Sequence, residues 1–401
     1  MPGQDRASSP LPPKRFIEQL TLTRIGQICA VVAFACALCA PAVGRLLGLG
    51  LTGDASPMAS DLPSDLKNLP HFLEIAAKRL TQDFGFRLPL IRLDVALRRT
   101  LGAPESRDVL VGQNGWLFYR GNHSIEQHRG VANFSAADLN TYVAAMNERR
   151  RWLERLGVGM IVMVVPDKST IYPEYLAPLL PQVAPTRLDQ LVERFAGTDI
   201  NLLDLRPALT AAKSTEFVYQ KTDSHWTPFG AHVGANQLLH ALHPAFPELD
   251  TLPAGAWTFQ QSSCAGGDLM RMLVNPRDPH ETVPLPVRNF SDHVTARSAV
   301  PMAPCSNDFG VGGWSLDGAL VVTDRSTRPK LLVIGDSFAG PLLPFLEQEF
   351  SQVEFFHKFS IEECQFIEKH RPDIVLFETA QRYLEEDPRN PPEIAADPKA
   401  R

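Results

Sequence analysis

A serine with the setting of a nucleophile, Ser337, follows a short apolar run at 331–334 and the pair Gly335-Asp336. Apolar residues then recur with helical spacing, which predicts a strand, a sharp turn and a helix over 338–350. This arrangement places Ser337 at the carboxyl edge of a parallel sheet, where open α/β folds bind ligands. Amides at the start of the helix could stabilise an oxyanion there. The alternative is that Ser337 only caps the helix.

A second polar stretch could activate that hydroxyl. Asp223 and His225 are two positions apart, so in an extended segment both side chains lie on one side of the backbone. A carboxylate there can hold an imidazole through its Nδ1–H. The two stretches together indicate a Ser-His-Asp triad. A capped loop or a metal pair could also use Asp223 and His225, although a metal would lack an obvious third ligand nearby.

These stretches resemble motifs of a known family. Gly335-Asp336-Ser337-Phe338 looks like the nucleophile block of the SGNH/GDSL hydrolases. Asp223-Ser224-His225-Trp226 looks like the triad block of the alginate O-acetyltransferases of the AlgJ/AlgX type. In ordinary SGNH hydrolases the Asp and His follow the Ser, whereas here they precede it, as in the acetyltransferase group. Further matches lie at 111–119, 165–173 and 267–273, so the resemblance covers about 83–384.

The resemblance implies an α/β, SGNH-hydrolase-like (flavodoxin-like) fold, with a parallel sheet flanked by helices. It also implies an O-acetyltransferase that moves an acetyl group through a serine acetyl-enzyme onto hydroxyls of an exported polysaccharide, in exopolysaccharide biosynthesis. Acetyl-CoA is cytoplasmic and no Gly-rich phosphate loop is visible, so a membrane-bound O-acyltransferase is the implied acetyl donor. We expect no cofactor and no metal.

Two alternatives stay open. One is an SGNH-type esterase that removes acetyl groups from a periplasmic glycan, and the other is a non-catalytic scaffold of a polysaccharide-secretion complex. The triad alone does not separate a transferase from an esterase, because water and a sugar hydroxyl attack the same intermediate. The sequence does not identify the polysaccharide.

Three further residues are candidates for substrate binding. Lys168 follows an apolar strand predicted at 159–165, at the same sheet edge as Ser337, so it could contact an anionic or carbohydrate ligand. The alternatives for Lys168 are solvation and pairing with Asp167. Arg382 and Tyr383 match a C-terminal Glu/Arg/Tyr element of the resembled family.

The first part of the chain indicates export. Residues 1–24 are polar and net basic. Residues 25–44 carry no charge, and a segment of this length can cross a bilayer as a helix. Basic residues before this span place the N-terminus in the cytoplasm and the bulk of the chain in the periplasm, anchored in the inner membrane. A cleavable signal peptide ending near 40–42 is the alternative. We expect a linker at 45–70, the catalytic domain at 71–384 and a disordered tail at 385–401.

Composition and cysteine usage agree with an exported globular enzyme. The 401 residues are 44% hydrophobic with a formal net charge of -6, so no basic field marks a nucleic-acid partner. Three of the six cysteines lie within 25–44. Cys264 and Cys305 could form a disulfide in an oxidising periplasm, which leaves Cys364 for the core.

Helix and strand patterns predict the elements that position these residues. Strands at 331–334, 353–356 and 374–377, with a helix at 361–370, form two βαβ units and hence three parallel strands. Earlier elements are a helical pattern over 71–101, a hairpin at 109–119, helices from 135, 186 and 228, and strands at 159–165 and 200–205.

Periodicity fails between 243 and 329, which predicts a loop-rich insertion with a function of its own. Gly266-Gly267-Asp268 opens a short helix at 269–273 that could return toward the site. Asp268 or Arg271 could contact substrate, and a helix cap explains Asp268 equally well.

Overall fold

The computed structural model describes residues 31–32, 34–36, 106–176, 180–249, 251–273, 280–298, 319–357 and 361–384. The chain divides into two units, Met1–Ala103 and Pro104–Arg401, and the second unit contains the central sheet and its helices. The predicted linker at 45–70, the helical pattern at 71–101, Cys305 and the tail at 385–401 lie outside the described residues. So does most of the predicted span at 25–44, and no helix within the described ranges is long and apolar enough to cross a membrane.

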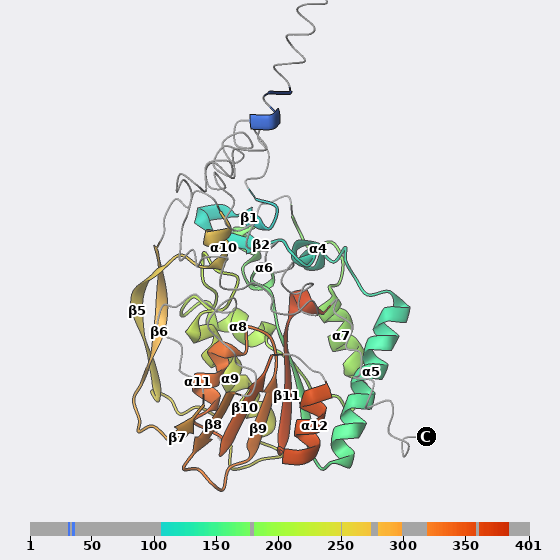
Figure 1. Cartoon of the computed structure of the whole chain (residues 1–401), viewed down its shortest axis with the longest axis vertical. Helices are drawn as coiled ribbons and strands as arrows, with labels where there is room; N and C mark the ends of the chain where they lie inside the picture. Colours follow the sequence, from blue (N-terminus) through green and yellow to red (C-terminus); the bar gives the residue numbers. More distant parts are fainter. Residues whose placement is uncertain are drawn as a thin grey trace, which may run out of the picture. The chain divides into compact units, whose positions relative to one another are not determined.

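A mixed sheet of seven strands, counted over the described residues, forms the centre of this unit, in the order β4-β3-β11-β9-β10-β8-β7 (Figure 1). The strands are β3 (Gly159–Val165), β4 (Leu202–Asp204), β7 (Val294–Arg297), β8 (Ala319–Thr323), β9 (Lys330–Ile334), β10 (Gln352–Phe356) and β11 (Ile374–Ala380). The first five in the order pair in parallel, and β8 and β7 continue the sheet antiparallel. The predicted parallel run of three strands is confirmed as β11-β9-β10.

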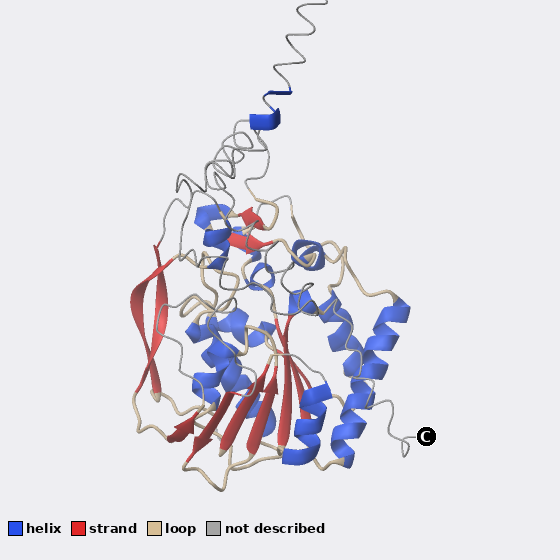
Figure 2. Ribbon diagram, in the orientation of Figure 1, coloured by secondary structure: helices blue, strands red, loops and turns tan. Residues whose placement is uncertain are grey.

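Helices cover both faces of this sheet (Figure 2). One face packs against α5 (Ala136–Arg155), α7 (Arg187–Phe195) and α12 (Ile361–His370), and the other against α8 (Arg206–Ala212), α9 (Pro228–Leu242) and α11 (Leu343–Leu346). Successive residues of β9 alternate between these layers, since Leu331 and Val333 lie in one core and Leu332 and Ile334 in the other. A strand buried on both faces is apolar throughout, which is why 331–334 is an unbroken apolar run.

Side-chain caps fix where three of the helices begin. The Ser135 hydroxyl accepts a hydrogen bond from the N–H of Asp138, and Thr186 forms a reciprocal capping box with Asp189. The hydroxyl of Thr227 accepts from the N–H of Gly230, and Pro228 occupies the first helical position of α9. The starts predicted for these helices are therefore confirmed.

The helix predicted at 338–350 is much shorter in the structure. A 3-10 turn, η5 (Gly340–Leu342), is followed by the single turn of α11. Pro341 and Pro344 explain the difference, because proline has no N–H to donate and its ring crowds the preceding turn.

The insertion at 243–329 also differs from the prediction. Its described part contains a long antiparallel hairpin of β5 (Trp257–Ala265) and β6 (His280–Arg288), with the short helix α10 (Asp268–Met272) between them. Pro284 and Pro286 lie within β6, and because proline is unusual inside a strand, the sequence pattern did not predict one there. Both strands of a two-stranded ribbon are edge strands, where proline is tolerated.

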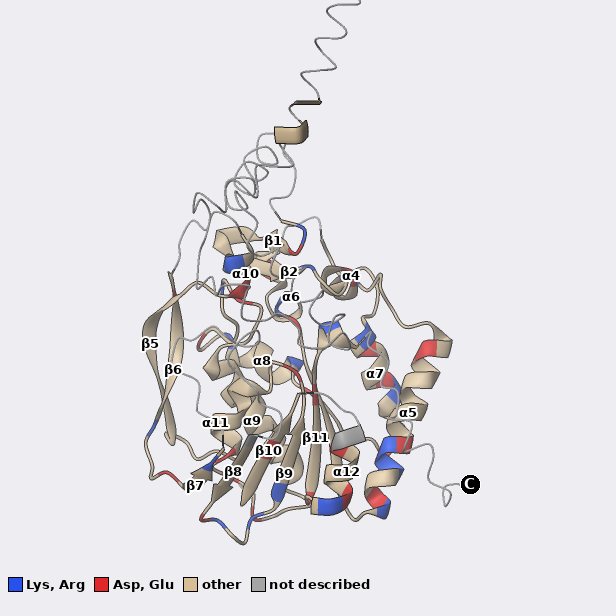
Figure 3. Cartoon of the chain, viewed as in Figure 1, with Lys and Arg blue, Asp and Glu red and all other residues tan. Residues whose placement is uncertain are grey.

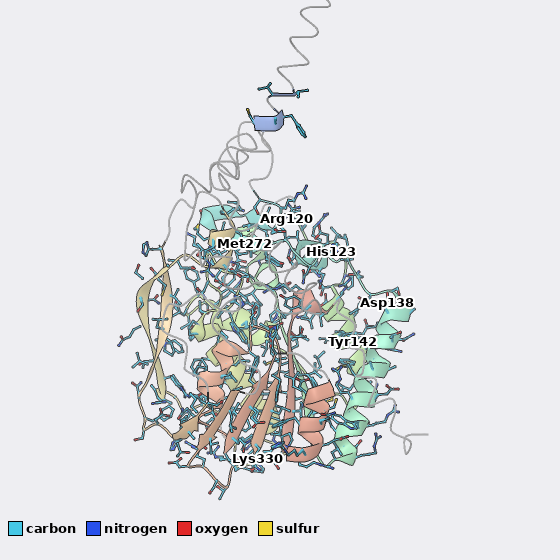
Figure 4. The ribbon with its side chains drawn as sticks, in the orientation of Figure 1. Arg120, His123, Asp138, Tyr142, Met272 and Lys330 are labelled. Carbon is cyan, nitrogen blue, oxygen red and sulfur yellow. The ribbon has the colours of Figure 1, made fainter. Side chains whose placement is uncertain are left out.

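The carboxyl ends of the parallel strands carry the candidate site. β3 leads into α6 (Lys168–Ile171), β9 leads into Ser337, and β11 leads into η6 (Gln381–Tyr383). Lys330, at the start of β9, lies at the opposite end of this unit from Met272 of α10, so α10 is on the carboxyl side of the sheet (Figure 4). Charged residues gather on the outer helices and on loops, and few lie on the central strands (Figure 3).

Candidate active site

The turn that carries Ser337 is tied to the neighbouring strand β11. The Asp336 carboxylate accepts from the N–H of Phe338 at 2.8 Å and from the N–H of Ala380 at 2.7 Å. The N–H of Asp336 in turn donates to Glu378 at 3.0 Å. A side chain at Gly335 would place its Cβ 2.5 Å from Glu378 Oε2, so the close approach of Glu378 requires glycine there.

Glu378 is a buried carboxyl group that supports this turn. Burial raises the pKa of Glu378 well above its usual range, and the nearby charge of Asp336 raises it further. Two carboxylates packed this closely would repel each other if both were ionised. Glu378 and Asp336 thus form a closely packed pair at the turn, in which the Asp336 carboxylate accepts from the amides of Phe338 and Ala380.

The structure brings His225 and Ser337 together, as the sequence predicted. His225 Nε2 lies 2.8 Å from Ser337 Oγ, and His225 Nδ1 lies 2.6 Å from Asp223 Oδ1. The His225 and Phe338 rings pack with their centroids 4.7 Å apart. The indole N–H of Trp226 donates to the main-chain carbonyl of Phe338 at 3.2 Å. This side-chain to main-chain hydrogen bond is a second link between the two motifs. Asp223 and His225 are buried, and Ser337 is partly exposed.

Asp223 has the electrostatics of a carboxylate that supports an imidazole. Burial alone would raise the pKa of Asp223, but the His225 side chain and backbone N–H groups lower it to about 2. The N–H of His225 donates to Asp223 Oδ1 at 2.9 Å, and the N–H of Asp268 donates to Oδ2 at 2.8 Å. Asp223 thus stays ionised and can accept the Nδ1–H of His225 across the physiological pH range.

Lys168 faces the protein interior. It is 3% exposed, and its ammonium donates to the carbonyls of Gln220, Lys221 and Asp223 at 2.9, 3.2 and 2.6 Å. Solvation of Lys168 and its pairing with Asp167, the two predicted alternatives, are both wrong. Burial lowers the pKa of Lys168 to about 8, against the opposing effect of nearby carboxylates. In this structure Lys168 holds the loop before His225, and its donors do not point to solvent.

Arg382 is also buried, and Tyr383 is only partly exposed. The Arg382 guanidinium pairs with Asp167 at 3.2 Å and donates to Ser224 Oγ at 3.4 Å. It lies over the Phe338 ring, 4.9 Å from its centroid. Of the three residues proposed for substrate binding, only Tyr383 keeps part of its surface open, and it lies beside Arg382.

The insertion contributes two carboxylates to the site, Glu281 and Asp268, and the sequence pattern did not predict the part played by Glu281. Glu281 of β6 accepts from the N–H groups of Lys221 and Thr222 and from the Thr222 hydroxyl, at 2.8, 3.1 and 2.5 Å. Asp268 accepts from the N–H and the hydroxyl of Ser224, each at 2.6 Å. The predicted return of Asp268 toward the site is confirmed. The Gly266-Gly267-Asp268 motif indicated that Asp268 could lie near the site. The residues around Glu281 gave no indication that its carboxylate would bond to Lys221 and Thr222.

Asp268 is a third possible ligand beside Asp223 and His225, which raises the question of a metal. Ligand atoms of Asp223, His225 and Asp268 lie within 4.8 Å of one another. The Asp223 and Asp268 oxygens, however, are already engaged by N–H and O–H donors, His225 Nδ1 among them. This arrangement fits a protonated Nδ1 held by a carboxylate better than a cation bound to the same atoms.

The two amides at the nucleophile turn differ in their hydrogen bonding. The N–H of Ser337 donates to no group within the described residues, while the N–H of Phe338 is engaged by Asp336. The prediction that neighbouring amides of a helix start would share this role does not hold for Phe338. The physical reason is that the chain after Ser337 forms a turn stabilised by Asp336 instead of entering a helix directly.

Comparisons with known proteins agree with the motifs. A family model described as "SGNH hydrolase-like domain, acetyltransferase AlgX" matches residues 109–356. The probable alginate O-acetylase AlgJ of Azotobacter vinelandii is 28% identical over 326 residues, covering 77% of each chain. The protein of the same name from Pseudomonas aeruginosa is 28% identical over 371 residues, covering 85% of this chain and 87% of its own.

Solved structures show the same fold. Bacillus cereus PatB1 with a sulfonyl adduct superposes with a TM-score of 0.52 at 17% identity, covering 70% of this chain and 96% of that chain. At this level of identity the likeness concerns the fold alone.

Proposed function

This chain belongs to the family of SGNH hydrolase-like domains of the acetyltransferase AlgX type, and we propose that it transfers acetyl groups through Ser337 onto hydroxyls of an exported polysaccharide. The observation that carries the proposal is the continuous chain of contacts from Asp223 through His225 to Ser337, at 2.6 and 2.8 Å. Nucleophile, base and orienting carboxylate stand in the order that acyl transfer through serine requires.

In the first half-reaction His225 Nε2 removes the Ser337 proton as Oγ attacks the acetyl carbonyl carbon. The carbonyl oxygen becomes an oxyanion, which the Ser337 N–H stabilises. Asp223 stabilises the imidazolium, which then gives its proton to the leaving group of the donor. The product is an acetyl ester of Ser337.

In the second half-reaction a sugar hydroxyl takes the place of the leaving group. His225 removes its proton, the sugar oxygen attacks the acetyl carbon, and Ser337 Oγ leaves and regains a proton from the imidazolium. Water would give hydrolysis by the same steps, so transfer requires that the acceptor hydroxyl reaches the acetyl ester before water does.

The names of the relatives support an exopolysaccharide acceptor. The proteins from Azotobacter vinelandii and Pseudomonas aeruginosa are called probable alginate O-acetylases, and we extend the acceptor class, a polysaccharide in the course of export, to this chain. The acetyl donor in our proposal is a membrane-bound O-acyltransferase that passes acetyl groups across the inner membrane. The catalytic unit then lies in the periplasm, behind an anchor formed by 25–44.

Intact-protein mass spectrometry tests the covalent step. The full chain and Ser337→Ala are incubated with para-nitrophenyl acetate and quenched in acid. We expect one added acetyl group on the wild type, none on Ser337→Ala, and at least a ~10³-fold slower gain for His225→Ala. An adduct of equal yield on Ser337→Ala would refute the serine route.

The acceptor test separates transfer from hydrolysis. Adding an oligosaccharide of the exported polymer, such as an alginate oligomer, should speed loss of the adduct and produce acetylated sugar. If the adduct decays at the same rate with and without sugar, and only acetate is released, the protein is an esterase and the proposed transfer is wrong.

A further inference from the structure

The start of α10 is bonded to the triad loop by reciprocal hydrogen bonds. The N–H groups of Gly267 and Met270 donate to the hydroxyl and the carbonyl of Thr222 at 2.9 and 3.0 Å. The N–H of Asp268 donates to the Asp223 carboxylate, and the carboxylate of Asp268 accepts from the N–H and hydroxyl of Ser224. We call residues 267–270 the docking segment.

The fit of the docking segment against the triad carboxylate is tight. A Cβ added at Gly267 would lie 2.5 Å from Asp223 Oδ2, so the backbone approaches the carboxylate as closely as glycine permits. Asp223 Oδ1 faces His225 while Oδ2 faces the Asp268 N–H. Rotation of the Asp223 carboxylate would break both bonds, so the docking segment fixes the orientation of the group that orients His225.

Asp268 brings a second negative charge to the same imidazole. Its Oδ2 lies 3.8 Å from His225 Nδ1, and the Ser224 hydroxyl lies between them, 2.6 Å from Asp268 Oδ2 and 3.4 Å from Nδ1. Within the described residues, the charged groups that also contact His225 or its loop include Asp223, Arg382 on η6, Lys168 on α6 and Glu281 on β6. Asp223 is the first carboxylate near His225 Nδ1, and Asp268 is the second.

We propose that Asp268 is a positioning residue for acyl transfer, which holds Asp223 through its amide and stabilises the His225 imidazolium through its carboxylate. The inference rests on the proposed function, because it assigns a role within the Ser337 reaction. It explains why a helix in a distant insertion is built against the triad loop. No contact between Asp268 and substrate is required.

The test measures the pH dependence of acetyl-enzyme formation on the full chain, with para-nitrophenyl acetate in single-turnover conditions. In Asp268→Asn the amide contact to Asp223 is retained but the charge is lost. Since an imidazolium with one fewer anion beside it forms less readily, the acid limb should move by about one unit to lower pH, and the plateau rate should fall by about 10-fold to 100-fold. Ser224→Ala keeps the Asp268 charge, so its acid limb should move less.

A matched control is Asp324→Asn, which removes an exposed carboxylate 2.9 Å from the Nδ1 of another histidine, His293. Its profile should equal that of the wild type. An unchanged acid limb in Asp268→Asn, with a rate within twofold of wild type, would overturn the positioning role. A lower rate with an unmoved acid limb would overturn it as well, because loss of fit alone lowers the rate at every pH. Absence of any adduct on the wild type would instead refute the proposed function.

Discussion

Two buried carboxyl groups at the site, Asp223 and Asp167, have pKa values shifted in opposite directions because their hydrogen-bond partners differ. Asp223 accepts hydrogen bonds from an imidazole and two amides, and its pKa falls to about 2 despite burial. Asp167 faces one guanidinium at 3.2 Å, and its second oxygen has no hydrogen-bond partner within the described residues. Burial therefore dominates at Asp167 and raises its pKa to about 6, although Arg382 opposes the shift. Asp223 and Asp167 therefore differ because the His225 side chain and two amides offset the effect of burial at Asp223, while a single guanidinium does not offset it at Asp167.

This difference predicts a pH dependence of stability. A carboxyl whose folded-state pKa is raised from 3.8 to about 6 contributes stability that is fully present below its unfolded pKa and is lost as pH rises through about 6. The free energy of unfolding of the wild type, relative to Asp167→Asn, should therefore fall by roughly 3 kcal/mol between about pH 4 and pH 7. Urea denaturation at several pH values measures it.

Asp138→Asn, at the exposed start of α5, is measured alongside as a second Asp→Asn exchange. A constant difference for Asp167→Asn would show that Asp167 is ionised to the same extent in the folded and unfolded chain.

Residue identities predicted the cluster of Asp223, His225 and Ser337 better than they predicted the residues around it. Ser337, His225 and Asp223 stand in short motifs whose chemistry can be read locally. Lys168 bonds to carbonyls 52 to 55 positions away along the chain. No local pattern reveals that a lysine after a strand will be buried, because the burial comes from a loop that arrives later in the sequence.

Two elements hold the loop that carries Asp223 and His225. Lys168 of α6 binds the loop's carbonyls, and Glu281 of β6 binds its amides at Lys221 and Thr222. These contacts satisfy main-chain groups that a buried loop could not pair by itself. The β5–β6 hairpin is therefore part of the support of the candidate site.

Glu281→Gln tests this role of the hairpin. A Gln side chain has one acceptor oxygen where the carboxylate has two, so at least one of three donors loses its partner. Hydrogen exchange at the amides of Lys221 and Thr222 should become at least about 10-fold faster, and adduct formation on Ser337 should slow. Hydrogen–deuterium exchange mass spectrometry resolves this segment.

The control is Glu216→Gln, since Glu216 hydrogen-bonds Gln261 of β5 and so contacts the same hairpin away from the loop. Exchange at 221–222 should not change in that variant. If Glu281→Gln also left this exchange unchanged, the hairpin would not support the triad loop.

Elements with strong local signals were predictable, and those shaped by tertiary contacts were not. β9, β10, β11 and α12 match their predicted ranges closely, because each strand is a buried apolar run and the helix has regular spacing. The hairpin of β5 and β6 was missed because polar residues and prolines interrupt its alternation. The helix after Ser337 was predicted too long because apolar spacing outweighed two prolines in the pattern.

At the scale of the whole unit, the site needs contributions from nearly the full length of the fold. Its parts come from the end of β3, the loop before α9, the α10 and β6 insertion, the turn after β9 and the end of β11. The family model matches 109–356, which spans all of these segments except the end of β11. A fragment ending before β8 would contain Asp223 and His225 but would have neither the nucleophile nor the acidic support of Glu378.

The proposed location gives a prediction for the whole chain. Residues 1–24 carry Arg6, Lys14, Arg15 and Arg24, while 25–44 carry no charge, so the N-terminus should stay in the cytoplasm. Cys264 is disulfide-bonded, which suits an oxidising compartment. Alkaline phosphatase needs disulfides to fold, so a fusion placed after Arg401 should be active in Gram-negative cells. Deleting 1–44 should abolish that activity, and an active deletion fusion or an inactive full-length one would contradict a periplasmic catalytic unit.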